Sequence, residues 1–225
     1  MPPRSQAELT VNFLLICEGT SDRGLVPHLA DLCVRAGAAV AMGDAPDLGR
    51  LPHPPGKAIE KQARVAIEFA GNVNLLFAHQ DSDGHDPEEV KGRILRSLAG
   101  VVSCPRHVCV IPVHELEAWL LLDEVAIRQV VGSPRGTEDL DLPPPRLVEK
   151  TPNPKERLKA ALSLASGKHG SRRHEVTRAF SEHRAMLLQR LDTEGPIRHL
   201  PAWKKLEDDV KAAIFDLAEG VRAKR

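Results

Sequence analysis

Aromatic residues are scarce in this chain of 225 residues: they make up 3% of it, and Tyr is absent. We therefore expect a core of Leu, Val, Ala and Ile, which is sufficient because 42% of the residues are hydrophobic. The four cysteines form no CxxC pair, which favours a reducing compartment and no disulfide framework. No segment is long and apolar enough for a membrane span, and Met1–Glu8 lacks a signal-peptide core. These absences predict a cytoplasmic protein that does not enter a membrane.

Net charge is also lacking, but the charges are unevenly distributed. Of 31 basic and 31 acidic residues, residues 150–225 contain 17 Lys and Arg and 10 Asp and Glu, which leaves 14 and 21 for residues 1–149. An acidic front part and a basic back part suit a metal-dependent enzyme with a polyanionic substrate. Basic helices that are merely solvated would produce the same asymmetry, and the sequence leaves both interpretations open.

Short apolar runs alternate with amphipathic stretches over the first 131 residues. The runs predict strands at Val11–Cys17, Ala38–Met42, Val73–Ala78 and His107–Val113. The stretches between them predict helices at 23–35, 57–70 and 86–99, and a further helix begins at Glu115. This alternation predicts an α/β fold with a parallel, Rossmann-like sheet.

The predicted organisation has three consecutive parts. Residues 10–131 form the α/β core, and the proline-rich residues 132–154 form a connector. Residues 155–225 form a C-terminal helical extension packed on the core, with helices at about 155–166, 173–191 and 203–222.

Carboxylates follow three of the predicted strands. They are Glu18 after the first strand, Asp81 and Asp83 after the third, and Glu115 and Glu117 after the fourth. In an open parallel sheet the carboxyl ends of the strands form one edge, where ligands bind. Because Mg²⁺ prefers oxygen ligands, five carboxylates at one edge predict a hard-metal site.

Acidic residues at such positions are also typical of structural roles. In a first helical turn they interact favourably with the helix dipole, which accounts for Glu115 and Glu117 without a metal. The DSDG sequence resembles part of a calcium loop, but that loop needs a Glu where this chain has Gly92. Three histidines beside the acids are candidates for supporting or spectator roles: His79, His85 and His114.

Three segments carry a resemblance to the Toprim superfamily: LLICEGTSD (14–22), LLFAHQDSDG (75–84) and VIPVHELEAWLL (110–121). That superfamily pairs a Glu after the first strand with a DxD after a later one, in a compact α/β fold. The third segment also resembles the Toprim part of overcoming-lysogenization-defect (OLD) nucleases. Over residues 10–125 the chain resembles small bacterial proteins of the DUF4276 type. It departs from the pattern at His79-Gln80, where relatives often have apolar or acidic residues.

The resemblance implies a nuclease-like phosphodiester hydrolase that depends on Mg²⁺ or Mn²⁺, in a phage-defence or DNA-repair system. In it Glu18 is a metal ligand or general base, Asp81 and Asp83 hold the cation, and Glu115 and Glu117 complete a second cation site or position the first. The implied catalytic residues are Glu18, Asp81, Asp83 and Glu117.

Basic residues of the helical extension are expected to neutralise nucleic-acid phosphates: Lys155, Lys168, Arg172 and Arg173. Two alternatives stay open, namely a nucleotidyl or phosphoryl transferase and a non-catalytic component of a defence complex that binds nucleic acid or a partner protein. A homodimer is compatible with the sequence, but no residue requires it.

Overall fold

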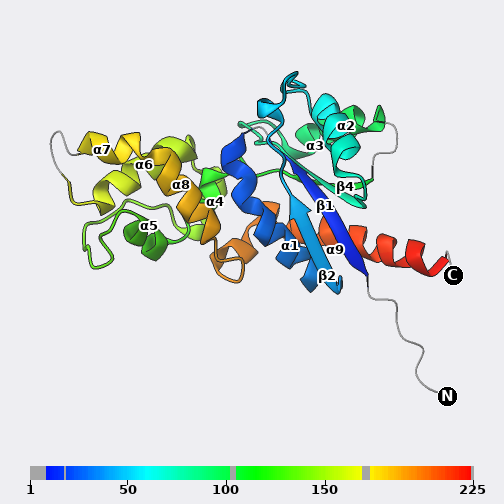
Figure 1. The fold of residues 1–225 in the computed structure, drawn as a ribbon. Helices are drawn as coiled ribbons and strands as arrows, with labels where there is room; N and C mark the ends of the chain where they lie inside the picture. The colour runs from blue at the N-terminus through cyan, green and yellow to red at the C-terminus, as the bar shows by residue number, and fades with distance from the viewer. Residues whose placement is uncertain (1–8, 18, 102–104, 169–172, 224–225) are drawn as a thin grey trace, which may run out of the picture. The chain divides into compact units, whose positions relative to one another are not determined.

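The computed structural model of the chain describes residues 9–17, 19–101, 105–168 and 173–223. Four strands form one parallel sheet in the order β2-β1-β3-β4 (Figure 1). Their bounds are β1 Thr10–Ile16, β2 Val40–Asp44, β3 Leu75–His79 and β4 Arg106–Val110. The predicted α/β fold with a parallel sheet is therefore confirmed.

Each strand forms for the reason that its sequence indicates. The central strands β1 and β3 are buried over most of their length, so they are largely apolar, apart from Thr10 and Asn12 in β1 and His79 in β3. The Phe13 and Phe77 rings pack edge to face between these strands, with their centroids 5.1 Å apart. The edge strand β2 is partly exposed, with Met42 57% exposed. Pairing of Ile16 with Ala78 places the carboxyl ends of β1 and β3 at the same edge of the sheet.

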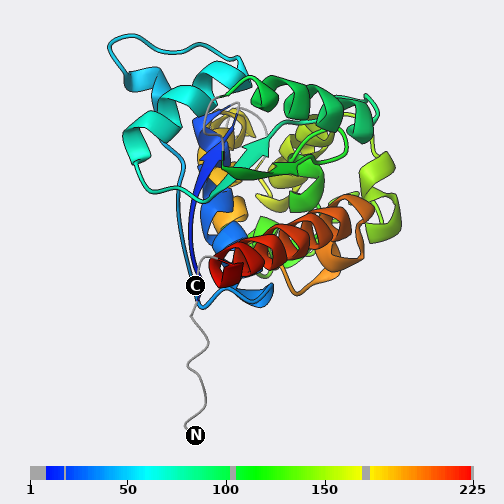
Figure 2. The ribbon, with the colours of Figure 1, turned by 90° about the vertical axis from the view of Figure 1, so that its right-hand side faces the viewer.

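Helices cover both faces of this sheet. The helices α2 (Ile59–Ala70) and α3 (Pro87–Ala99) lie over one face, and α1 (Val26–Arg35) and α9 (Pro201–Ala223) lie over the other (Figure 2). Between β1 and α1 the chain forms the short helix η1 (Thr20–Leu25), and between β2 and α2 it forms η2 (Leu48–Arg50).

The remaining elements are helical. They are α4 (Glu117–Leu120), α5 (Glu124–Val130), η3 (Pro145–Lys150), α6 (Pro154–Ala165), α7 (Arg173–Arg178), α8 (Phe180–Gln189) and η5 (Pro196–His199). None of the described helices is both long enough and apolar enough to cross a membrane.

Two predicted helices are divided in the structure. The helix expected from Glu115 is the short α4 followed by α5, because the Asp123 carboxylate accepts a hydrogen bond from the Ala126 amide at 2.8 Å and so starts a new helix. The helix expected over 173–191 is α7 and α8, which a turn at Ala179 separates.

Contacts group the chain into two compact units. Unit 1 comprises Met1–His79, Lys91–Val110 and Lys205–Arg225, and unit 2 comprises Gln80–Val90 and Ile111–Lys204. The units interleave along the sequence, whereas the predicted core, connector and extension are consecutive, and those domain boundaries stay a prediction. Most of α9 belongs to unit 1, where Asp209 and Asp216 form ion pairs with Lys91 and Arg106, each at 2.6 Å.

Three of the four cysteines lie in the described part of the chain. Cys17, Cys33 and Cys109 form no disulfide in the described part of the chain, and Cys104 lies outside it. Burial raises the pKa of the Cys33 thiol to about 12, so this side chain acts as a small hydrophobe.

Candidate functional site

The acidic segments that follow β3 and β4 are bound to each other in unit 2. The Ser82 amide donates to the Pro112 carbonyl at 3.2 Å, and the Asp83 amide donates to the His114 carbonyl at 2.9 Å. In return the His114 amide donates to the Ser82 hydroxyl at 2.9 Å. Ser82 is fully buried, so these bonds are sheltered from water. The DSDG and HELE sequences therefore form one hydrogen-bonded structure.

Asp81 and Asp83 occupy different positions in this structure. The Asp81 carboxylate is half-buried and accepts a hydrogen bond from the Leu116 amide at 3.0 Å, next to both glutamates of the HELE segment. The Asp83 side chain is exposed, and its backbone is left-handed, with a φ of 50°. Asp tolerates that conformation better than most residues, and Gly84, with a φ of 80°, continues the turn.

Glu115 is bound to the beginning of a helix. Its Oε2 accepts a hydrogen bond from the Lys155 amide at 2.9 Å, where α6 starts after Asn153. A carboxylate at a helix N-terminus satisfies an amide that has no partner within the helix and interacts favourably with the helix dipole. Glu115 thus holds α6 against the acidic segments.

Glu117 forms a buried ion pair. Its Oε1 lies 2.7 Å from Arg184 Nε, and the two residues are 3% and 6% exposed. Arg184 comes from α8, so this pair fastens α8 to α4. The sequence carries one sign that Arg184 is buried. Arg184 lies on the apolar stripe of its helix, together with Phe180, Leu187 and Leu188.

Glu18 lies outside the described residues, and the residues on either side of it are placed as follows. Cys17, directly after β1, donates its thiol hydrogen to the Gly19 carbonyl at 3.1 Å, and η1 then begins at Thr20. Asp22 of η1 is 6% exposed and lies 3.6 Å from His79 Nδ1 at the end of β3. The sequence identifies His79 as a candidate site residue because it lies beside the acidic residues. It does not identify Asp22, because an Asp is common at the start of a helix.

The other candidates are placed as follows. His85 is exposed, and His114 is half-buried with a left-handed backbone. Lys155 is exposed, and Lys168 forms an exposed ion pair with Glu175 at 3.2 Å. Arg172 lies outside the described residues, and so does the side chain of Arg173.

The donor chemistry of the joined segments fits a hard cation. No group of three or more His, Cys, Asp or Glu side chains that could hold a metal lies within the described ranges. Mg²⁺ does not need such a cage, because one or two carboxylates usually hold it together with water and substrate phosphates. Asp81, Asp83 and Glu115 offer carboxylate oxygens on a backbone that hydrogen bonds hold in place.

Comparison of the chain with protein-family models, with curated proteins and with solved structures found no match. The structure establishes an α/β fold with a four-stranded parallel sheet, and the family stays a prediction from the sequence.

Proposed function

We propose that the chain is a phosphodiester hydrolase that acts on nucleic acid and depends on a divalent metal ion. The observation that carries the proposal is the hydrogen-bonded structure of the DSDG and HELE segments, which follow adjacent strands of one parallel sheet. The segment with Glu18 follows β1, which is the other neighbour of β3. The order of these segments and their places after strands are those of the Toprim superfamily.

The proposed cation-holding residues are one or two of Asp81, Asp83 and Glu115, because the described carboxylates do not form a group of three that could hold a metal ion. The resemblance adds Glu18. Bound Mg²⁺ or Mn²⁺ would acidify a water molecule and neutralise charge on the phosphate. A Glu18 carboxylate oxygen would take the proton from the attacking water, as the resemblance implies. The amide that Leu116 donates to Asp81 fixes the orientation of that carboxylate, so it needs little rearrangement on binding.

Glu117 has a supporting role in this proposal and does not hold the metal ion. Its carboxylate is buried and bound to Arg184, whereas a hydrated cation with a phosphate ligand needs an accessible oxygen. We therefore assign Glu117 to the support of the HELE segment. The proposal keeps Lys155 and Lys168 as phosphate contacts, since an exposed pair such as Lys168 with Glu175 contributes little and exchanges readily.

The test is cleavage of labelled single-stranded DNA, plasmid and RNA, each with Mg²⁺, with Mn²⁺ and with EDTA. The informative variant is Asp81→Asn, because its amide oxygen can still accept the Leu116 hydrogen bond while the charge is lost. Asp139→Asn is the matched control, since the Asp139 carboxylate also accepts a backbone amide bond, from Asp141 at 2.9 Å.

We expect cleavage that EDTA abolishes and that Asp81→Asn lowers at least about a hundredfold, the order of effect seen when one group that stabilises the transition state is removed. Asp139→Asn should keep the wild-type rate. Metal-independent cleavage, or equal rates for the two variants, would contradict the proposal.

A further inference from the structure

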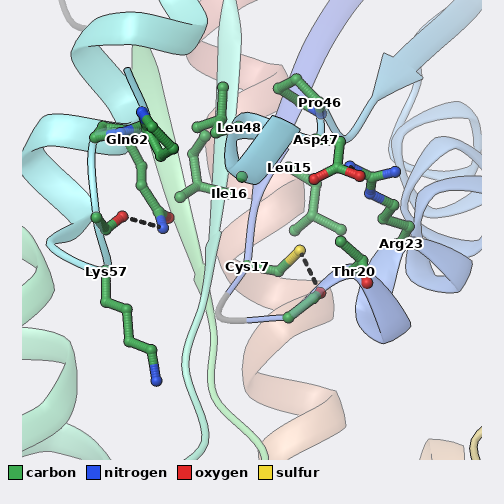
Figure 3. Close-up of a pocket in the computed structure, with 15 residues that line it drawn as sticks. Leu15, Ile16, Cys17, Thr20, Arg23, Pro46, Asp47, Leu48, Lys57 and Gln62 are labelled. Atoms are coloured by element: carbon green, nitrogen blue, oxygen red, sulfur yellow. Dashed lines mark hydrogen bonds and ion pairs between the residues drawn. The ribbon is translucent and has the colours of Figure 1, made fainter. Parts of the chain in front are cut away.

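A cavity of about 270 Å³ lies in unit 1, beside the end of β1 and the loop after β2 (Figure 3). Leu15 and Ile16 of β1 and Leu48 of η2 form an apolar part of its wall. Arg23 lies on one side of the view and Lys57 on the opposite side, with the apolar side chains between them. Its size approaches that of cavities that take small organic ligands.

Arg23 contributes an incompletely satisfied donor to this cavity. Its Nη2 is buried and donates no hydrogen bond within the described part of the chain. The Asp47 carboxylate is 3.5 Å away, but Asp47 also pairs with Arg50, whose Nε is 3.0 Å from the same oxygen. Because one carboxylate is shared by two guanidinium groups, Arg23 retains capacity to bind an anion.

The charges at the cavity favour an anionic ligand. Among the described residues that line the cavity, Arg23 and Lys57 outweigh the single negative charge of Asp47, which leaves a net charge of about one positive unit. A guanidinium binds phosphate oxygens in a fork that an ammonium cannot reproduce. The ligand class indicated at Arg23 is therefore a phosphate.

The apolar wall of the cavity between Arg23 and Lys57 indicates which chemical group carries the phosphate. Besides the leucines, Pro46, Pro54 and Pro55 line the cavity and offer flat apolar surfaces without amide hydrogens. Gln62 also lines the cavity. Its side-chain amide donates a hydrogen bond to the Gly56 carbonyl at 2.9 Å, which ties the loop before α2 to that helix. A planar base could pack against this apolar wall while its phosphate binds Arg23.

We propose that this cavity binds a nucleotide, with its phosphate on Arg23 and its base against Leu48 and the prolines. The nucleotide is either free or one residue of a single strand, in which case Lys57 receives a neighbouring phosphate. The cavity contains no residue of the DSDG and HELE segments, but Cys17 and Gly19, which line it, flank Glu18. The binding test is therefore made in EDTA, where it does not depend on metal-dependent cleavage.

The test is isothermal titration of the full chain with AMP, inorganic phosphate and a 12-nucleotide single-stranded DNA, all in EDTA. The variant is Arg23→Gln, and the matched control is Arg50→Gln, which removes the other partner of Asp47. Arg50 is 88% exposed and does not line the cavity. We expect Arg23→Gln to weaken nucleotide binding at least about tenfold, the loss typical of one charge-assisted hydrogen bond. Arg50→Gln should change it less than about twofold.

Binding of AMP assigns the cavity to a free nucleotide. Binding of the 12-mer alone, weakened by Lys57→Gln as well as by Arg23→Gln, assigns it to a strand. No binding of any probe by the wild type, or equal weakening by Arg23→Gln and Arg50→Gln, overturns the proposal. Thermal unfolding of each variant verifies that it is folded, and Lys57→Gln changes an exposed side chain whose loss the fold tolerates.

Discussion

Unit 1 and unit 2 differ in what holds them together. In unit 1 the central strands bury Phe13, Leu15 and Phe77 against one another, so apolar packing dominates its interior. The described residues of unit 2 include no strand, and there a buried ion pair and hydrogen bonds between loops connect the elements. Unit 2 also buries apolar side chains, among them Trp119 and Trp203, whose rings pack edge to face at 5.2 Å. We infer that both units are sensitive to changes of volume, and that unit 2 is in addition sensitive to the loss of a buried charge.

The largest expected effect is that of Glu117→Ala in unit 2. The substitution leaves the Arg184 guanidinium buried without its carboxylate, which typically costs about 3–5 kcal/mol. Urea unfolding measures the loss, and hydrogen exchange should show α8 losing protection while β1 keeps it. The control is Asp216→Asn, which breaks a half-exposed pair with Arg106 and should cost less than about 1 kcal/mol. Equal losses in the two variants would remove the proposed difference between the units.

A volume change in unit 1 should come next. Gly43 lies on β2, and a Cβ atom added there would overlap the ring of Phe13. Gly43→Ala should therefore destabilise the chain by about 1–3 kcal/mol, the range for overpacked cores, although it introduces no charge. Gly220→Ala in α9 is the control, since nothing lies within 4 Å of the added atom. An unchanged unfolding midpoint for Gly43→Ala would show that the sheet is less tightly packed than the structure indicates.

The smallest expected effect concerns pH. Partial burial raises the pKa of Asp209, but hydrogen bonds from Lys91 and Lys205 outweigh it, so the pKa lies below its ordinary value of 3.8. The stabilisation is complete above the unfolded pKa and is lost as pH falls through the lower folded pKa. Asp209→Asn should cost about 1 kcal/mol at pH 7 and progressively less as the pH falls through the folded pKa, measured by urea unfolding. A cost that does not change with pH would mean that the ion pairs are not its source.

The two units also differ in how much of each is predictable from the sequence. The sheet was predictable because β1 and β3 contain the apolar runs Phe13–Ile16 and Leu75–Ala78, and the acidic residues after the strands were visible in the same pattern. Burial of Glu117 was not predictable, since its partner Arg184 is 67 residues away. The apolar stripe around Arg184 indicates a buried Arg, but it does not identify the carboxylate that pairs with it. The end of α4 was not predictable either, because Asp123 caps α5 within a segment whose sequence is typical of one continuous helix.

Mn²⁺ binding to the joined acidic segments, followed by electron paramagnetic resonance without nucleic acid, decides whether these segments hold a metal ion. We predict that the wild type and Asp139→Asn bind Mn²⁺ equally and that the double variant Asp81→Asn with Asp83→Asn loses at least about tenfold in affinity. Wild-type protein that binds no Mn²⁺, or a double variant that binds it as well as the wild type does, would contradict the proposed metal site.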